Sequence, residues 1–190
     1  RSFIVGATFI AGALLITPSA QAATITVCAV GCDYTTLNDA ISADVPGQDT
    51  YLLDTGYTYV FPPESNFISL PDDTILTCSP GVVFGDDLGG TANINPGNNT
   101  LIQECTFENT QFDATGKSLV SWVDNVFSEN TYTSITLTES DGFTIANNTN
   151  LNHLQIQNAD NGFVASNEFN CRFSSNCITL ATAGGGPFDY

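Results

Sequence analysis

The chain has very little positive charge. Its 190 residues include 20 acidic side chains but only three lysines and arginines, which gives a net charge of −17 at pH 7. A surface of one sign repels nucleic acids and anionic membranes, so neither is expected as a partner. Acidic polysaccharides are repelled as well, unless a cation such as Ca²⁺ bridges them to the protein. The acidic residues are spread along the chain, which favours a secreted protein kept soluble in salty water.

Histidine is equally scarce, and this limits the enzymes that the chain can be. The single His153 lies beside an expected strand, and the chain has no Gly-x-Ser-x-Gly nucleophile elbow. Paired carboxylates, as in a glycosidase, occur at Asp72-Asp73 and at Asp86-Asp87. We keep Asp86 and Asp87 as candidates for catalysis or for a Ca²⁺ site, against the interpretation that they are ordinary acidic turn residues. No other cofactor is expected.

The first residues have the form of a secretion signal. Arg1 precedes an uncharged apolar run over residues 3–16, which is shorter than the roughly 20 residues that cross a bilayer. Ala20-Gln21-Ala22 then has the small-x-small form that signal peptidase cuts. We predict a signal peptide over residues 1–22, with cleavage between Ala22 and Ala23, and therefore a secreted or cell-surface protein. An uncleaved membrane anchor or a buried helix is the alternative.

Six cysteines behind an export signal point to disulfide bonds. Two pairs are local in sequence: Cys28 with Cys32, and Cys171 with Cys177. Cys78 and Cys105 hold the same position in consecutive repeats, where strands lie about 4.8 Å apart, so they are either bonded or stacked as free thiols. The spacings also resemble those of zinc ligands, but one histidine in the chain makes a poor metal set.

A pattern of six residues recurs along the chain. It reads apolar, two residues, Cys or Asn, one residue, and often Phe, and its copies start at Ile75, Ile102, Trp122, Ile145 and Val164. The steps of 27, 20, 23 and 19 residues fall in the range of a solenoid. A second series inside alternating runs repeats at 21 and 22 residues: Ile135, Ile156 and Ile178. Two strand types in step predict an all-β parallel β-helix over residues 49–180, with about six to seven coils.

Asparagine occupies the Cys/Asn position in the later copies of this pattern, at Asn125, Asn148 and Asn167. A buried Asn has both a carbonyl and an NH₂ group, so one side chain can bond the next along a stack. It also tolerates the backbone of a sharp bend. We therefore predict an asparagine ladder here rather than a row of ligands. The aromatic residues in the same register are expected to pack in the core rather than stack on sugars: Trp122, Phe107, Phe127 and Phe169.

Each end of the expected solenoid has its own features. Residues 23–48 are predicted to form an N-terminal cap with a short helix over 36–42, because Thr35 or Thr36 can cap it and an apolar face follows. Residues 181–190 are expected to form a flexible tail. The strand near 177–180 would then keep an open edge, which predicts end-to-end assembly with another copy or docking on a larger surface assembly.

The segment from Cys32 to Tyr59 resembles the opening of pectate-lyase-like, right-handed parallel β-helix proteins. The likeness rests on three stretches: Cys32-Asp33-Tyr34-Thr35-Thr36-Leu37-Asn38-Asp39-Ala40-Ile41, then Gly47-Gln48-Asp49-Thr50-Tyr51-Leu52-Leu53, then Thr55-Gly56-Tyr57-Thr58-Tyr59. It implies right-handed coils, an amphipathic helix over the open end of the solenoid, and asparagine ladders at the bends. Gly85-Asp86-Asp87 further resembles the paired-aspartate motif of polygalacturonases. The Gly-His-Gly element and basic cluster of that family are absent, and Arg172 is the only candidate for the base of a lyase.

Two functional hypotheses follow. The preferred one is a secreted, non-catalytic β-helix that acts as a surface, adhesive or structural subunit. It rests on the incomplete catalytic sets, the bare last coil and the small number of coils. The other is a small carbohydrate-active enzyme or polysaccharide-binding module of the pectate-lyase type. The sequence leaves open whether the chain is an enzyme.

Overall fold

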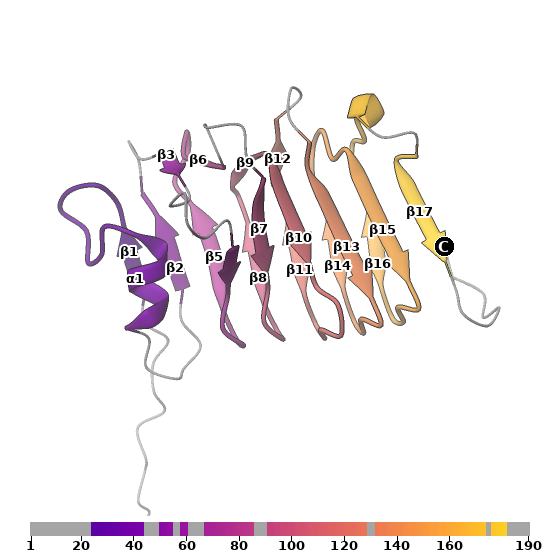
Figure 1. Ribbon diagram of the computed structural model, residues 1–190, viewed down its shortest axis with the longest axis horizontal. Helices are drawn as coiled ribbons and strands as arrows, with labels where there is room; N and C mark the ends of the chain where they lie inside the picture. The colour runs from indigo at the N-terminus through magenta and orange to yellow at the C-terminus, as the bar shows by residue number, and fades with distance from the viewer. Residues whose placement is uncertain are drawn as a thin grey trace, which may run out of the picture.

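The computed structural model is a solenoid of parallel β-strands, with one short α-helix among the described residues (Figure 1). It describes residues 24–43, 50–54, 58–60, 67–85, 91–128, 132–173 and 176–181. The predicted signal peptide with its cleavage site at Ala22 and Ala23, residues 182–190, and the candidates Asp86 and Asp87 all lie outside the described residues. The chain makes about six turns, with one strand of the six-stranded sheet per turn. The predicted parallel β-helix is therefore confirmed.

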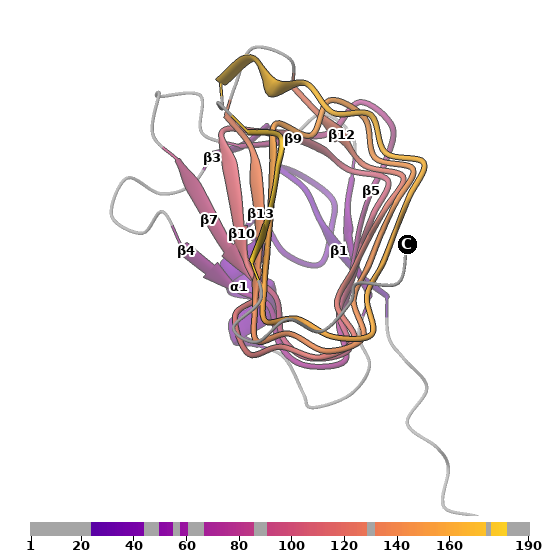
Figure 2. The ribbon, with the colours of Figure 1, turned by 90° about the vertical axis from the view of Figure 1, so that its right-hand side faces the viewer.

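Three sheets run along the described solenoid, and all of their strand pairs are parallel. Sheet A has seven strands: β1 (Thr24–Val27), β2 (Thr50–Leu53), β5 (Ile75–Cys78), β8 (Leu101–Gln103), β11 (Ser121–Val123), β14 (Thr144–Ala146) and β16 (Phe163–Ala165). Sheet B has four: β3 (Thr58–Val60), β6 (Val83–Gly85), β9 (Thr106–Glu108) and β12 (Val126–Phe127). Sheet C has six: β4 (Phe67–Ser69), β7 (Ala92–Asn95), β10 (Thr110–Asp113), β13 (Ser134–Thr138), β15 (His153–Gln157) and β17 (Ile178–Ala181). Seen along the axis, sheets A and C face each other and sheet B closes one side between them (Figure 2).

The core consists of stacked inward columns. Side chains alternate between the two faces of a strand, and parallel strands in register place each inward residue above the last. On sheet A the main column is fully buried and contains Tyr51, Leu76, Ile102, Trp122 and Ile145. Their neighbours along each strand point outward and are partly exposed. Each turn thus buries its apolar side against the turns before and after it, so that stability depends on stacking.

Aromatic rings fill the interior next to sheet B. Phe84, Phe107 and Phe127 follow one another along the axis with ring centroids 5.8 and 5.9 Å apart. Phe112 from sheet C meets Phe107 edge-to-face at 5.0 Å and contacts Trp122 at 5.9 Å. The predicted core packing of Trp122, Phe107 and Phe127 is confirmed. Phe169, in the last turn, is partly buried against the same core.

Two register assignments from the sequence are wrong. Ile75 pairs with Leu101 and points outward, whereas Leu76 pairs with Ile102 and is buried. A slip of one residue reverses the face of a strand, so the first copy of the pattern was misaligned. In the second series, Ile156 pairs with Leu137 instead of Ile135. That slip is two residues, which keeps the side chain on the buried face.

The corner between sheet C and sheet A is built from a stack of left-handed residues. One residue per turn has a φ between 52° and 67°: Asp73, Asn99, Leu119, Gly142 and Asn161. The backbone N–H group of each of the first four donates a hydrogen bond to a carbonyl of the following turn. Aspartate, asparagine and glycine adopt this conformation readily, whereas other residues are strained in it by about 1–2 kcal/mol. The backbone of Leu119 is therefore strained at this position, and its side chain is 58% exposed.

The asparagines form a hydrogen-bonded ladder at the bend that follows sheet A. The Nδ2 of Asn125 donates to Oδ1 of Asn148 at 3.0 Å, and the Nδ2 of Asn148 donates to Oδ1 of Asn167 at 2.9 Å. The amide groups also donate to backbone carbonyls, and their oxygens accept from backbone N–H groups one turn back. Asn125 and Asn148 are completely buried. The ladder satisfies backbone groups that the bend removes from the sheets.

The N-terminal end of the solenoid carries the helix α1, Leu37–Ser42, beside β1 and β2 (Figure 1). Thr36 is its N-cap, because the Thr36 Oγ1 accepts a hydrogen bond from the Asp39 N–H at 3.0 Å. Leu37 and Ala40 are buried in the core. This helix was expected from the sequence at nearly the same residues. β1, which precedes it, pairs with β2 and is the first strand of sheet A.

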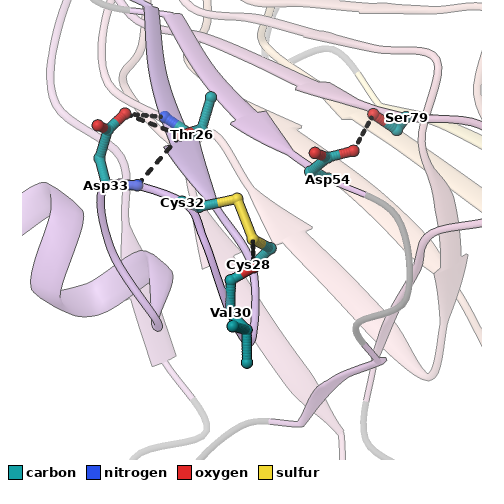
Figure 3. The surroundings of a disulfide bond; sticks show 7 residues. All are labelled: Thr26, Cys28, Val30, Cys32, Asp33, Asp54 and Ser79. Atoms are coloured by element: carbon teal, nitrogen blue, oxygen red, sulfur yellow. Dashed lines mark hydrogen bonds between the residues drawn. A yellow bond between two sulfur atoms is a disulfide. The ribbon is translucent and has the colours of Figure 1, made fainter.

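Three disulfides join the cysteines in the predicted pairs: Cys28–Cys32, Cys78–Cys105 and Cys171–Cys177, with Cα atoms 5.5, 4.9 and 5.1 Å apart. Cys78 and Cys105 are thus bonded, which decides between the alternatives left open by the sequence. Next to the first bond, the Asp33 carboxylate accepts from the Thr26 N–H and hydroxyl at 2.9 and 2.8 Å (Figure 3). The bonds fasten the first turn, the middle and the last turn.

Candidate functional site

Three described acidic residues at the turns between sheet C and sheet A are hydrogen-bonded to asparagines: Asp72, Asp73 and Asp141. The Asp72 carboxylate accepts from the Asn98 N–H at 2.6 Å, and hydrogen bonds from the Asn98 backbone and amide lower the pKa of Asp72. The carboxylates of Asp73 and Asp141 accept from the side-chain amides of Asn99 and Asn161, at 2.8 and 2.7 Å. Each of these three carboxylates is paired with an asparagine of the next turn, so it stabilises the stacking of the turns.

No group of three histidine, cysteine or acidic residues within the described part of the chain is arranged to hold a metal ion. The sequence candidates Asp86 and Asp87 lie outside that part. Gly85, the last described residue before them, pairs in register with Glu108 of β9. A catalytic or Ca²⁺-binding role for Asp86 and Asp87 therefore stays a prediction.

His153 lies on the outer face of sheet C and has two hydroxyl neighbours. Its Nδ1 is 3.4 Å from the Tyr132 hydroxyl, and its Nε2 is 3.2 Å from Oγ1 of Thr179. A serine-hydrolase arrangement needs a carboxylate that orients the imidazole and stabilises its charged form. In this protein the Tyr132 hydroxyl lies beside the His153 Nδ1, where a triad has its carboxylate. A neutral hydroxyl cannot balance the charge of an imidazolium ion. Among the described residues, the two side-chain hydrogen-bond partners of His153 are hydroxyl groups, and neither is a carboxylate.

The outer face of sheet C is rich in amides and hydroxyls. We call it the sheet C face, and its outward residues are Phe67, Ser69, Asn93, Asn95, Gln111, Asp113, Ser134, Thr136, Thr138, His153, Gln155, Gln157 and Thr179. Asp113 is its single carboxylate, and that carboxylate accepts from Thr115 within its own turn. Amide and hydroxyl columns repeat at the strand spacing of about 4.8 Å along the axis. The face therefore offers donors and acceptors with little charge.

The outer face of sheet A is uncharged. We call it the sheet A face, and it has two outward residues on each of seven strands: Thr24, Thr26, Thr50, Leu52, Ile75, Thr77, Leu101, Gln103, Ser121, Val123, Thr144, Ala146, Phe163 and Ala165. None of them is buried. The Asp33 carboxylate, which accepts from the Thr26 hydroxyl, borders the face at β1. On a protein with a net charge of −17, strands without a charged outward residue mark a place where another surface can approach.

Neither face was predicted from the sequence. The residues of each face are separated by about 20 positions along the chain, and only the strand register brings them together. The outward assignment of Ile75 and the partners of His153 depend on that register as well. The sequence did contain a signal for the sheet A face, because the outward positions of its strand segments contain no Asp, Glu, Lys or Arg.

The comparisons give no relative. No protein-family model, no curated protein and no solved structure matches the chain. Within the part of the chain that the structure describes, no helix is long and apolar enough to cross a membrane. The functional argument therefore rests on the faces and turns described above.

Proposed function

We propose that the protein is a secreted, non-catalytic β-helix that acts as a surface, adhesive or structural subunit. The observation that carries this proposal is the distribution of charge. The carboxylates of Asp72, Asp73 and Asp141 are hydrogen-bonded at turns, whereas no outward residue on the seven strands of sheet A is charged. A broad neutral face can lie against an uncharged surface without electrostatic repulsion, and its threonines and aliphatic side chains supply hydrogen bonds and apolar contact.

The rigidity of the scaffold supports a contact role. Disulfides fasten the first turn, the middle and the last turn, and the asparagine ladder fixes the bend between them. Side chains on such a frame are already ordered before contact, which reduces the entropy lost on binding. Disulfides also fit an oxidising compartment, and secretion is part of the proposal for that reason. The short helix at the N-terminal end supports a relation to pectate-lyase-like proteins.

The sheet C face supports a second candidate, a polysaccharide-binding module. Its amides and hydroxyls match the donors and acceptors of a sugar chain, and Phe67 and Tyr132 add aromatic surface to it. Net negative charge favours a neutral polysaccharide over one rich in uronic acids.

A matched pair of substitutions distinguishes the two candidates. Thr77 and Thr136 are both partly exposed outward residues, on the sheet A face and the sheet C face respectively. Binding of the disulfide-bonded chain to insoluble neutral glucan particles is measured by co-sedimentation for the wild type, Thr77→Glu and Thr136→Glu. The adhesive proposal expects binding that Thr77→Glu weakens and Thr136→Glu leaves unchanged. The reverse order favours the polysaccharide module, and equal effects on both variants contradict a contact specific to either face.

A further inference from the structure

The last turn of the solenoid exposes its core. Val164 is the last residue of the inward column that contains Trp122 and Ile145, and Ile178 and Leu180 continue the inward columns of Leu154 and Ile156. Their exposed fractions are 40%, 44% and 41%, against 0–4% for their neighbours in the preceding turns. These three side chains form an apolar end of the described solenoid, and exposed apolar surface of this kind marks an interaction site.

The same turn has open strand edges on both sheets. β16 is the outermost strand of sheet A, and β17 is the outermost strand of sheet C. The carbonyls of Cys177 and Ala181 accept from the N–H groups of Leu154 and Asn158 in the preceding turn. By alternation, the backbone groups of Ile178 and Leu180 face the open edge. The Cys171–Cys177 bond holds this segment in place. A partner that pairs with both edges needs one strand beside β16 and another beside β17, spaced as sheets A and C are. The end of another β-solenoid has two strands in this arrangement.

The two ends of the molecule differ, and the difference decides which ends can meet. The N-terminal end carries α1, with Leu37 and Ala40 packed in the core, so the last turn cannot stack there as another turn would. The last turn, residues 158–181, has only Asp160, Glu168 and Arg172 as charged residues, a net charge of −1. Two copies can therefore approach through this end even though each has a net charge of −17.

We propose that two copies of the chain associate through their last turns, end to end, about a two-fold axis. Each β17 then pairs with the β17 of the second copy in antiparallel fashion, and β16 does the same on the opposite side. The contact is isologous and closes at two copies. Sheets about 10 Å apart and short strands give each end a contact area on the order of 400 Å². The total is below the roughly 1,200 Å² of a stable interface, so the dimer dissociates on dilution. This contact leaves the sheet A and sheet C faces free.

Sedimentation velocity of the disulfide-bonded chain over a wide range of concentrations tests this proposal, at about 0.15 M ionic strength to screen the net charge. Ile178→Glu is the test variant. Val126→Glu is its matched control, because Val126 has the same 44% exposure but lies on β12 in the middle of the solenoid. Leu180→Ser is a second variant that adds no charge. Far-UV circular dichroism establishes that each variant is folded.

The wild type and Val126→Glu are expected to reach twice the monomer mass and no more. Ile178→Glu and Leu180→Ser are expected to raise the dissociation constant about tenfold or more. A monomer at every concentration overturns the proposal, as does equal weakening by Ile178→Glu and Val126→Glu. Growth beyond two copies contradicts the closed contact. The glucan-binding assay above measures a different surface, so failure of either proposal leaves the other standing.

Discussion

Replacing Asn148 by leucine should destabilise the fold, even though the two side chains have nearly the same size. Asn148 is completely buried in the ladder. Its Nδ2 donates to the Trp122 carbonyl and to Asn167, both at 2.9 Å, and its Oδ1 accepts from the N–H and Nδ2 of Asn125 at 3.1 and 3.0 Å. Leucine can make none of these bonds.

The expected loss can be estimated from the groups that are left unpaired. They are the Asn125 N–H and one Asn125 amide hydrogen, because the Trp122 carbonyl keeps its place in the parallel ladder between β11 and β14. Each buried polar group without a partner costs about 1–3 kcal/mol, which gives roughly 4 kcal/mol in total. Burial of the leucine side chain returns about 2 kcal/mol. The free energy of unfolding should therefore fall by about 2 kcal/mol.

Urea unfolding at neutral pH with the disulfides intact measures this loss. Gln155→Leu on the sheet C face is the control, because that side chain points outward, and it should stay within about 0.5 kcal/mol of the wild type. Asn125→Leu and the double variant complete a cycle, in which the two losses should be far from additive. An Asn148→Leu protein within about 1 kcal/mol of the wild type would show that the ladder does not hold the bend.

Three further results are expected. Leu119→Asn should raise the free energy of unfolding by about 1 kcal/mol in thermal or urea unfolding, because Leu119 has φ +58° and asparagine accepts that conformation; a loss of stability would contradict this. Trp122→Phe should remain within about 1.5 kcal/mol of the wild type, because the buried Trp122 Nε1 has no hydrogen-bond partner, whereas Trp122→Ala should lose about 3–5 kcal/mol; equal losses would refute this explanation. Hydrogen bonds from Thr26 and Asn98 lower the pKa of Asp33 and Asp72 below the ordinary 3.8, so the stability that these carboxylates contribute is present above pH 3.8 and is lost as the pH falls through the folded pKa. In acid titrations, the double variant Asp33→Asn/Asp72→Asn should therefore lose less stability below pH 3.8 than the wild type. An unchanged pH profile would exclude this cause.

The fold could be predicted because its determinants repeat. Copies of one pattern about 20 residues apart, with Asn125, Asn148 and Asn167 at a shared position, require stacking, and the capped apolar face after Thr36 indicates the helix. The slip at Ile75 arose because Ile75 and Leu76 are both apolar. The bend after the strand also differs between these two turns. β5 continues through Cys78, whereas β8 ends at Gln103 and the left-handed residue Glu104 precedes Cys105. Sequence spacing alone does not reveal this difference.

The functional surfaces could not be predicted in the same way. An outward position is recognised only once the register is known, and a neutral face is a property of many strands together. Carboxylate pairs such as Asp72-Asp73 attract attention in a sequence, yet both of these side chains bind asparagines of the next turn. Turn geometry therefore explains this acidic pair, whereas Asp86 and Asp87 lie outside the described residues.

The most direct test of a non-catalytic role is an assay for polysaccharide cleavage. The disulfide-bonded chain is incubated with neutral and uronic-acid polysaccharides, with and without Ca²⁺, and new reducing ends and unsaturated products are measured over time. We expect no product above the buffer control with any substrate. Steady product release by the wild type, lost in Asp86→Ala or Asp87→Ala while Asp113→Ala keeps it, would contradict the proposal and identify the chain as an enzyme.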